Sequence, residues 1–154
     1  MIKFIVPGKP QGKARARSFR TKSGGIGHFT PDKTVLYENL IKTICLEEMK
    51  ENQKKYEGPV FLEIRALFHP IKKLINTKAK EKNFYSNDDL PCPICKPDAD
   101  NIAKVVKDAL NGIAYDDDKQ VASLSVQKFY IHKDLHEDQR ERIEVEIIDP
   151  KEMW

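Results

Sequence analysis

Acidic residues gather around one short segment of a chain that is otherwise basic. Asp98 and Asp100 precede this segment, and a run of three aspartates, Asp116–Asp118, follows it. Carboxylates that lie close together repel one another unless a cation lies among them. The cluster therefore predicts a divalent metal site, and the basic surroundings suggest that the site faces a phosphate backbone.

The residue types suit magnesium, with manganese as a substitute. Mg²⁺ prefers oxygen ligands and is typically held by one or two carboxylates plus substrate phosphate. Hydrolysis of a phosphodiester needs a deprotonated water, positive charge around the transition state, and help for the leaving 3′ oxygen. Aspartates can supply the metal site, and Lys104 can supply further positive charge or orient the water. The spacing leaves open whether one ion binds or two.

The segment between the acids has the period of an amphipathic helix. Its apolar residues recur at helical spacing and form one stripe, which consists of Ile102, Val105, Val106, Ala109 and Leu110. Asp98 or Asp100 can serve as N-cap, and Asn111-Gly112 gives a stop signal. We therefore expect a helix that packs against the core and leaves its first turn available for chemistry.

Each of these residues also has a plain structural interpretation. An aspartate before a helix is usually a cap, and three consecutive aspartates usually form a solvated turn. Lys104 is suitably placed for an ion pair with Asp100 at i,i+4, which contributes only about 0.2–0.5 kcal/mol. Only the co-occurrence of the acids and the lysine in one compact unit favours a catalytic interpretation.

The signature of the RusA family of Holliday junction resolvases resembles three strings of this chain. They are Lys96-Pro-Asp-Ala-Asp-Asn-Ile-Ala-Lys104, Asp108-Ala-Leu-Asn-Gly112 and Asp117-Asp118-Lys-Gln-Val121. The start of the family is also similar to Gly8-Lys-Pro-Gln-Gly-Lys-Ala-Arg-Ala-Arg17 and to Thr30-Pro-Asp32. The resemblance implies a metal-dependent endonuclease that nicks DNA at a four-way junction, with three aspartates and an assisting lysine at its active site. The segment 71–95 does not match the family pattern.

Position by position, the resemblance assigns roles to individual residues. Asp98 and Asp100 are the first two metal-binding acids, Lys104 is the lysine, and Asp118 is the third acid because it precedes x-Gln-Val. Asp117 is kept in reserve as a ligand. Paired nicks on two strands also imply a homodimer with twofold symmetry. Small proteins of this family often occur in prophage.

Positive charge is concentrated near the N-terminus. Six cations and no acid lie between Lys9 and Lys22, among Gly, Pro and Ser residues, which predicts a flexible basic arm that contacts phosphates. A second basic patch begins at Lys72. A solvated surface is the alternative interpretation of either patch. The predicted DNA-binding residues are Lys9, Lys13, Arg15, Arg17, Arg20, Lys72 and Lys73.

The pattern of elements predicts an α+β fold in a single small domain over residues 1–154. The expected order is β-α-β-α-β-β, with two main helices packed on a mixed sheet. Expected strands are 2–6, 60–68, 121–131 and 142–148, with the last two joined as a hairpin that has one solvated face. A long helix is expected from an N-cap at Thr30, with Pro31 in its first turn, to about residue 50. Its predicted inward residues are Leu36, Leu40, Ile44 and Cys45.

Two other classes of function stay open. One is a non-catalytic nucleic-acid-binding protein, and the other is a zinc-stabilised module built around Cys92 and Cys95. Within the nuclease class, a preference for forks or flaps cannot be separated from one for four-way junctions.

No apolar run approaches the roughly 20 residues of a membrane helix, and no signal peptide is apparent, so a soluble cytoplasmic protein is expected.

Overall fold

The computed structural model describes residues 1–49, 54–70, 93–131 and 137–153. Its strands are β1 (Ile2–Pro7), β2 (Arg17–Arg20), β3 (Ile26–Phe29), β4 (Val60–Phe68), β5 (Val121–Tyr130) and β6 (Arg142–Ile148). Its helices are α1 (Asp32–Glu48) and α3 (Ala99–Leu110), with two short 3₁₀ helices, η1 (Asp118–Gln120) and η2 (Pro150–Glu152). Among the described residues, no helix is both long and apolar enough to cross a membrane.

Four strands form one mixed sheet in the order β1-β6-β4-β5. β6 is antiparallel to both β1 and β4, whereas β5 is parallel to β4. This arrangement confirms the predicted α+β class and mixed sheet. The predicted hairpin between the last two strands is wrong, because β4 lies between β5 and β6. Alternation along a strand tells which face is buried, but it does not tell which strand is the neighbour.

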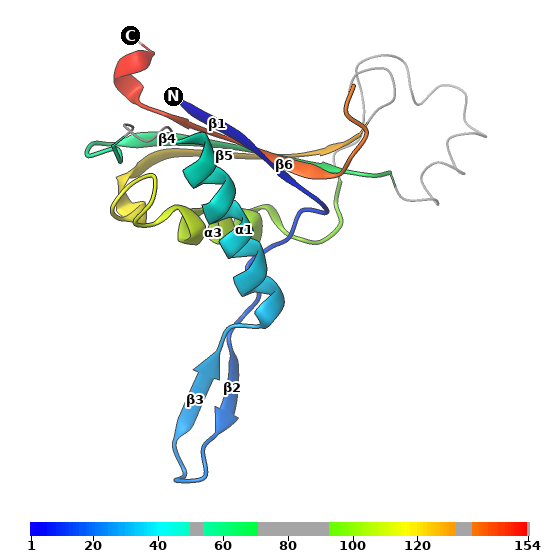
Figure 1. Cartoon of the computed structure of the whole chain (residues 1–154). Helices are drawn as coiled ribbons and strands as arrows, with labels where there is room; N and C mark the ends of the chain where they lie inside the picture. Colours follow the sequence, from blue (N-terminus) through cyan, green and yellow to red (C-terminus); the bar gives the residue numbers. More distant parts are fainter. Residues whose placement is uncertain (50–53, 71–92, 132–136, 154) are drawn as a thin grey trace, which may run out of the picture.

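Both helices cover the same face of the sheet (Figure 1). α1 packs on β1, α3 packs on β5, and the two helices contact each other. The covered face of β6 presents Ile143, Val145 and Ile147, which are fully buried, while Glu144 and Glu146 between them are half-buried. The alternation predicted for this strand is therefore confirmed, and one hydrophobic core holds α3 in place.

The buried face of α1 agrees with the predicted one only in part. Tyr37, Ile41 and Cys45 face the core together with Thr34, whereas Leu36 is 69% exposed and Leu40 is 38% exposed. Cys45 is buried as predicted, and Ile44 is partly buried against the core. The stripe Leu36-Leu40-Ile44 and the observed stripe Tyr37-Ile41-Cys45 have the same i, i+4, i+8 spacing, so periodicity alone could not choose between them. Helix α1 also begins later than predicted, at Asp32, because Pro31 occupies the N-cap position and no side chain caps the helix.

The N-terminal basic segment is more ordered than predicted. Part of it forms an antiparallel hairpin of β2 and β3, which projects from the N-terminal end of α1 away from the sheet (Figure 1). The turn depends on Gly24, whose φ of +85° suits glycine, and on a hydrogen bond of 2.8 Å from the Thr21 N–H to the Gly25 carbonyl. The sequence contains this turn signal, but a run of cations and glycines without apolar alternation obscures it.

Candidate metal and nucleic-acid site

The first turn of α3 leaves its acidic side chains available. Asp98 occupies the N-cap position, yet its side chain makes no capping hydrogen bond. Its carbonyl accepts hydrogen bonds of 3.1 Å from the N–H groups of Asn101 and Ile102, so the backbone begins the helix without help from the carboxylate. Asp98 and Asp100 are both exposed. Capping therefore does not explain why an acid stands at position 98.

A row of charged side chains runs along the outer face of α3. Asp100, Lys104 and Lys107 stand at i, i+4 and i+7, and the carboxylate of Asp100 lies 3.6 Å from the ammonium group of Lys104. The Lys107 ammonium group lies 3.0 Å from a carboxylate oxygen of Asp118. The chain after α3 therefore returns Asp118 to the same face of the helix that carries Asp100 and Lys104.

The three consecutive aspartates point to different partners. Asp116 pairs with Lys55 at 3.2 Å, and Asp117 caps η1 by accepting a hydrogen bond of 2.9 Å from the Lys119 N–H. Asp118 alone among the three pairs with α3. The side chain of Gln120 fixes this turn, because its Nε2 donates to the carbonyls of Tyr56 and Gly58. Asp117 thus has a structural role at the turn.

The acids are not gathered into one coordination sphere. Among the residues that the structure describes, no three His, Cys, Asp or Glu side chains are arranged to hold a metal ion. The oxygen-only donor set nevertheless suits Mg²⁺, which commonly takes only one or two protein carboxylates and completes its shell with water and phosphate. The metal-binding roles of Asp98, Asp100 and Asp118 remain predictions.

A hollow of about 670 Å³ opens beside Asp98. It lies between the N-terminal basic segment, the start of α1 and the start of α3. Among the described residues that line it, Asp98 is the only acid, whereas five are cations: Lys9, Lys13, Arg17, Lys33 and Lys96. A concave surface with this balance attracts an anion and holds it next to a carboxylate. It therefore suits a phosphate group beside Asp98.

The basic segment is attached to α3 by close backbone packing at Gly12. A Cβ atom at this position would lie 2.9 Å from the Cβ atoms of both Asn101 and Pro97. The N–H of Lys13 donates a hydrogen bond of 2.8 Å to the Asn101 carbonyl. Gly12 therefore permits the approach that brings the cations of the basic segment to Asp98.

Lys13 is held by acids of the protein itself. Its ammonium group pairs with Glu38 on α1 and lies 3.0 Å from Asp108 on α3. Burial by itself lowers the pKa of Lys13, but the bonds to these two carboxylates outweigh that effect and raise the pKa. Lys13 thus links α1 to α3 at the hollow. A contact between Lys13 and DNA stays a prediction.

The other predicted DNA-binding residues differ in position. Lys9 and Arg17 line the hollow, whereas Arg15 and Arg20 are exposed outside it. Lys72, Lys73 and Cys92 lie outside the described residues. The sequence did not single out Lys33 and Lys96, although Lys96 begins the string that resembles the family signature and Lys33 follows Thr30-Pro-Asp32.

The chain is similar to a known protein family and to an individual bacterial protein. The family model described as Endodeoxyribonuclease RusA matches residues 7–148. A protein of Bacillus subtilis (strain 168), named Uncharacterized protein YqaN, is 33% identical over 129 residues. That alignment covers 84% of this chain and 87% of the relative. The family match, over residues 7–148, includes both the basic segment and the acids around α3.

Proposed function

Because this chain belongs to the RusA family of endodeoxyribonucleases, we propose that it resolves four-way DNA junctions by paired hydrolysis of phosphodiester bonds. The observation that carries this proposal is the position of Asp98. This exposed carboxylate makes no capping hydrogen bond, stands at the start of α3, and lines a hollow to which five cations also contribute. Such a site can hold a DNA phosphate while an acid stays close to it.

We propose that Asp98, Asp100 and Asp118 bind Mg²⁺, with Mn²⁺ as a substitute and Asp117 in reserve. When bound, the ion would supply a nucleophilic water at neutral pH and stabilise charge on the phosphoryl oxygens. In the structure, Asp118 pairs with Lys107 and Asp100 pairs with Lys104, so these two acids already have positive partners on α3. A metal ion that binds the carboxylates of Asp100 and Asp118 would have to compete with these two lysines.

The cations of the hollow would bind and orient the DNA. Lys9, Arg17 and Lys33 lie on the side of the N-terminal segment and α1, and Lys96 lies two residues before Asp98 in sequence. They can contact phosphates on both sides of the bond to be cut, and so hold that bond at the acids. Lys104, which is exposed on α3, can stabilise negative charge that develops as the P–O3′ bond breaks.

Resolution of a junction requires two nicks related by a twofold axis. One copy of the chain presents one set of Asp98, Asp100 and Asp118, so two copies are needed for paired cuts. A homodimer with twofold symmetry, the commonest oligomer, would present both sites to one junction. We therefore propose that the active form is a dimer.

Cleavage of matched substrates tests the proposal. Purified protein is incubated with a four-way junction, a fork and a linear duplex of the same sequence, with Mg²⁺, Mn²⁺ or EDTA, and the cut positions are mapped. We expect symmetric nicks in the junction that require the metal. Preferential cutting of the fork would indicate a fork nuclease. Binding without cleavage in any metal would indicate a non-catalytic DNA-binding protein and would contradict the proposal.

A further inference from the structure

The β2–β3 hairpin has two chemically different faces. Its register pairs Arg17 with Phe29 and Phe19 with Gly27, so these side chains lie on one face. Ser18, Arg20, Ile26 and His28 occupy the opposite face. We call the face with Arg17, Phe19 and Phe29 the aromatic face. It combines one guanidinium group with two aromatic rings.

The two rings are exposed, and they share one surface. Phe19 is 50% exposed and Phe29 is 46% exposed, and their ring centroids lie 6.1 Å apart at an interplanar angle of 56°. A Cβ atom at Gly27 would lie only 2.5 Å from the Phe19 ring. The ring of Phe19 can therefore lie across the neighbouring strand only because residue 27 is glycine. The Phe19 ring therefore occupies the centre of the aromatic face.

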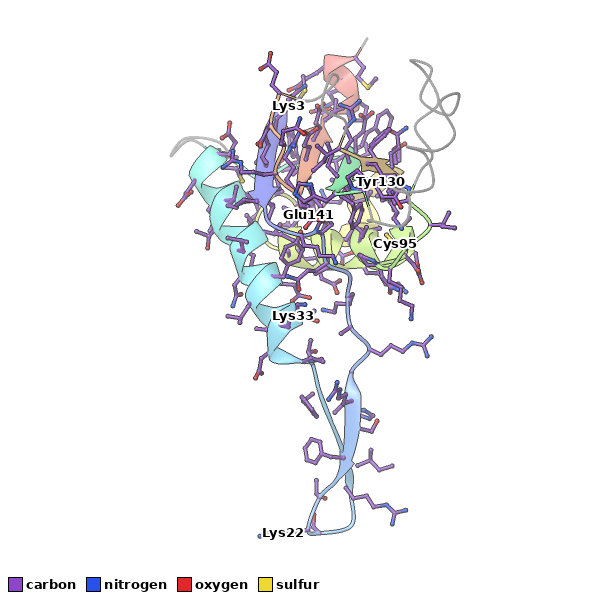
Figure 2. The ribbon with its side chains drawn as sticks, turned by 90° about the vertical axis from the view of Figure 1, so that its right-hand side faces the viewer. Lys3, Lys22, Lys33, Cys95, Tyr130 and Glu141 are labelled. Atoms are coloured by element: carbon purple, nitrogen blue, oxygen red, sulfur yellow. The ribbon has the colours of Figure 1, made fainter. Side chains whose placement is uncertain are left out.

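The rest of the described chain does not cover this face. β2 and β3 pack on each other, and neither has an extensive contact with another described helix or strand. Figure 2 shows the hairpin standing apart from the body, with Lys22 at its far end and Lys33 near its base. An isolated two-stranded hairpin is only marginally stable in water. A binding partner would therefore stabilise it.

The charge of the hairpin indicates which class of binding partner it would take. Residues 17–29 include Arg17, Arg20 and Lys22 and contain no Asp or Glu. An anionic partner with exposed flat surfaces complements this composition, since aromatic rings and arginine stack on nucleobases while cations contact phosphates. Arg17 also lines the hollow that contains Asp98. A DNA strand that occupies the hollow would therefore reach the aromatic face directly.

We infer that the aromatic face stacks against an unstacked base at the branch point of the DNA, and so favours branched DNA over linear duplex. The inference rests on the proposed function, because it takes junction DNA as the ligand of the hollow. A branch point exposes bases that a continuous duplex keeps stacked. Loss of a stacking contact weakens binding by about 5- to 150-fold, and this loss should be confined to the branched substrate.

Binding without cleavage tests the inference. The full chain is titrated in EDTA with a four-way junction and with a linear duplex of the same sequence, and 2-aminopurine at the branch point reports stacking. The variants are Phe19→Leu and Phe29→Leu, which keep apolar bulk but lose the ring. Phe19→Tyr keeps the ring, and Ile26→Ala is the matched control on the opposite face of the same hairpin.

We expect the leucine variants to bind the junction about 5- to 150-fold more weakly, to bind the duplex as wild type does, and to lose quenching of 2-aminopurine. Phe19→Tyr and Ile26→Ala should behave as wild type. The inference would be overturned if the leucine variants lost equal affinity for junction and duplex, or lost affinity for neither. It would also be overturned if they changed the oligomeric mass and not the affinity for DNA. If wild type cuts junctions in Mg²⁺ while these variants bind normally, the inference alone fails. If wild type neither prefers nor cuts the junction, the proposed function fails as well.

Discussion

Substitution of Gly12 by alanine tests how the basic segment is attached to the acids. The added Cβ would lie 2.9 Å from the Cβ atoms of Asn101 and Pro97, whereas ordinary contacts begin at 3.4 Å. The two segments must therefore separate by about 0.5 Å, and neither neighbouring atom is the end of a flexible side chain. Overpacking of this kind costs about 1–3 kcal/mol in the free energy of unfolding. For a chain of this size, the melting temperature should fall by roughly 2–12 °C.

The same displacement should lower activity. It moves the cations of the hollow relative to Asp98 and lengthens the hydrogen bond of 2.8 Å from the Lys13 N–H to the Asn101 carbonyl. A misplacement of 1 Å can cost about 100-fold in rate, so about 0.5 Å should cost on the order of 10-fold. Calorimetry and junction cleavage below the melting temperature measure the two effects.

Gly58→Ala is the matched control. No heavy atom lies within 4 Å of a Cβ at that position, and its φ is not in the left-handed region. We expect its melting temperature to stay the same or to rise slightly, because alanine restricts the unfolded chain more than glycine does. If Gly12→Ala melts and cleaves as Gly58→Ala does, the close packing between the basic segment and α3 is refuted.

Three further predictions concern the acids, Arg17 and the cysteines. Asp98→Asn, Asp100→Asn and Asp118→Asn should each retain junction binding while cleavage falls by orders of magnitude, and full cleavage by any of them would remove that residue from the site. Arg17→Gln should reduce the slope of log affinity against log salt by about 1 in a filter-binding or anisotropy titration, whereas Lys3→Gln, on the opposite face of the sheet, should leave it unchanged. Burial, together with the nearby charge of Glu48, raises the pKa of the Cys45 thiol to about 11. Iodoacetamide at pH 8 should therefore label Cys95 in the folded protein and leave the buried Cys45 unlabelled. Peptide mass spectrometry measures the two extents of labelling.

The elements with strong local patterns could be predicted from the sequence. The bounds of β4 and β6 coincide with the predicted ones, and the apolar stripe of α3 is buried as expected. The inward face of α1 could be predicted only in part. Cys45 is buried as expected, but Leu36 and Leu40 repeat with the same spacing as Tyr37 and Ile41, so the sequence could not choose between those pairs. The order of strands in the sheet depends on contacts between distant segments, which no local pattern determines.

In the candidate site, too, local features could be predicted from the sequence, whereas contacts between distant segments could not. The motif indicates which acids belong together, since Asp98 and Asp100 are only two positions apart in sequence. It does not indicate that Lys107 pairs with Asp118, because that contact depends on how the chain turns after α3. The hollow beside Asp98 was also not predictable, since three separate segments of the chain contribute its cations.

Binding of Mn²⁺ to the protein–junction complex tests the central claim most directly. Electron paramagnetic resonance can count the bound ions at low temperature, where cleavage is slow, for wild type and for Asp98→Asn, Asp100→Asn and Asp118→Asn. We predict that wild type binds Mn²⁺ and that each of the three variants loses affinity for it. Wild-type affinity for Mn²⁺ in Asp118→Asn would contradict the claim that acids before and after α3 share one metal site.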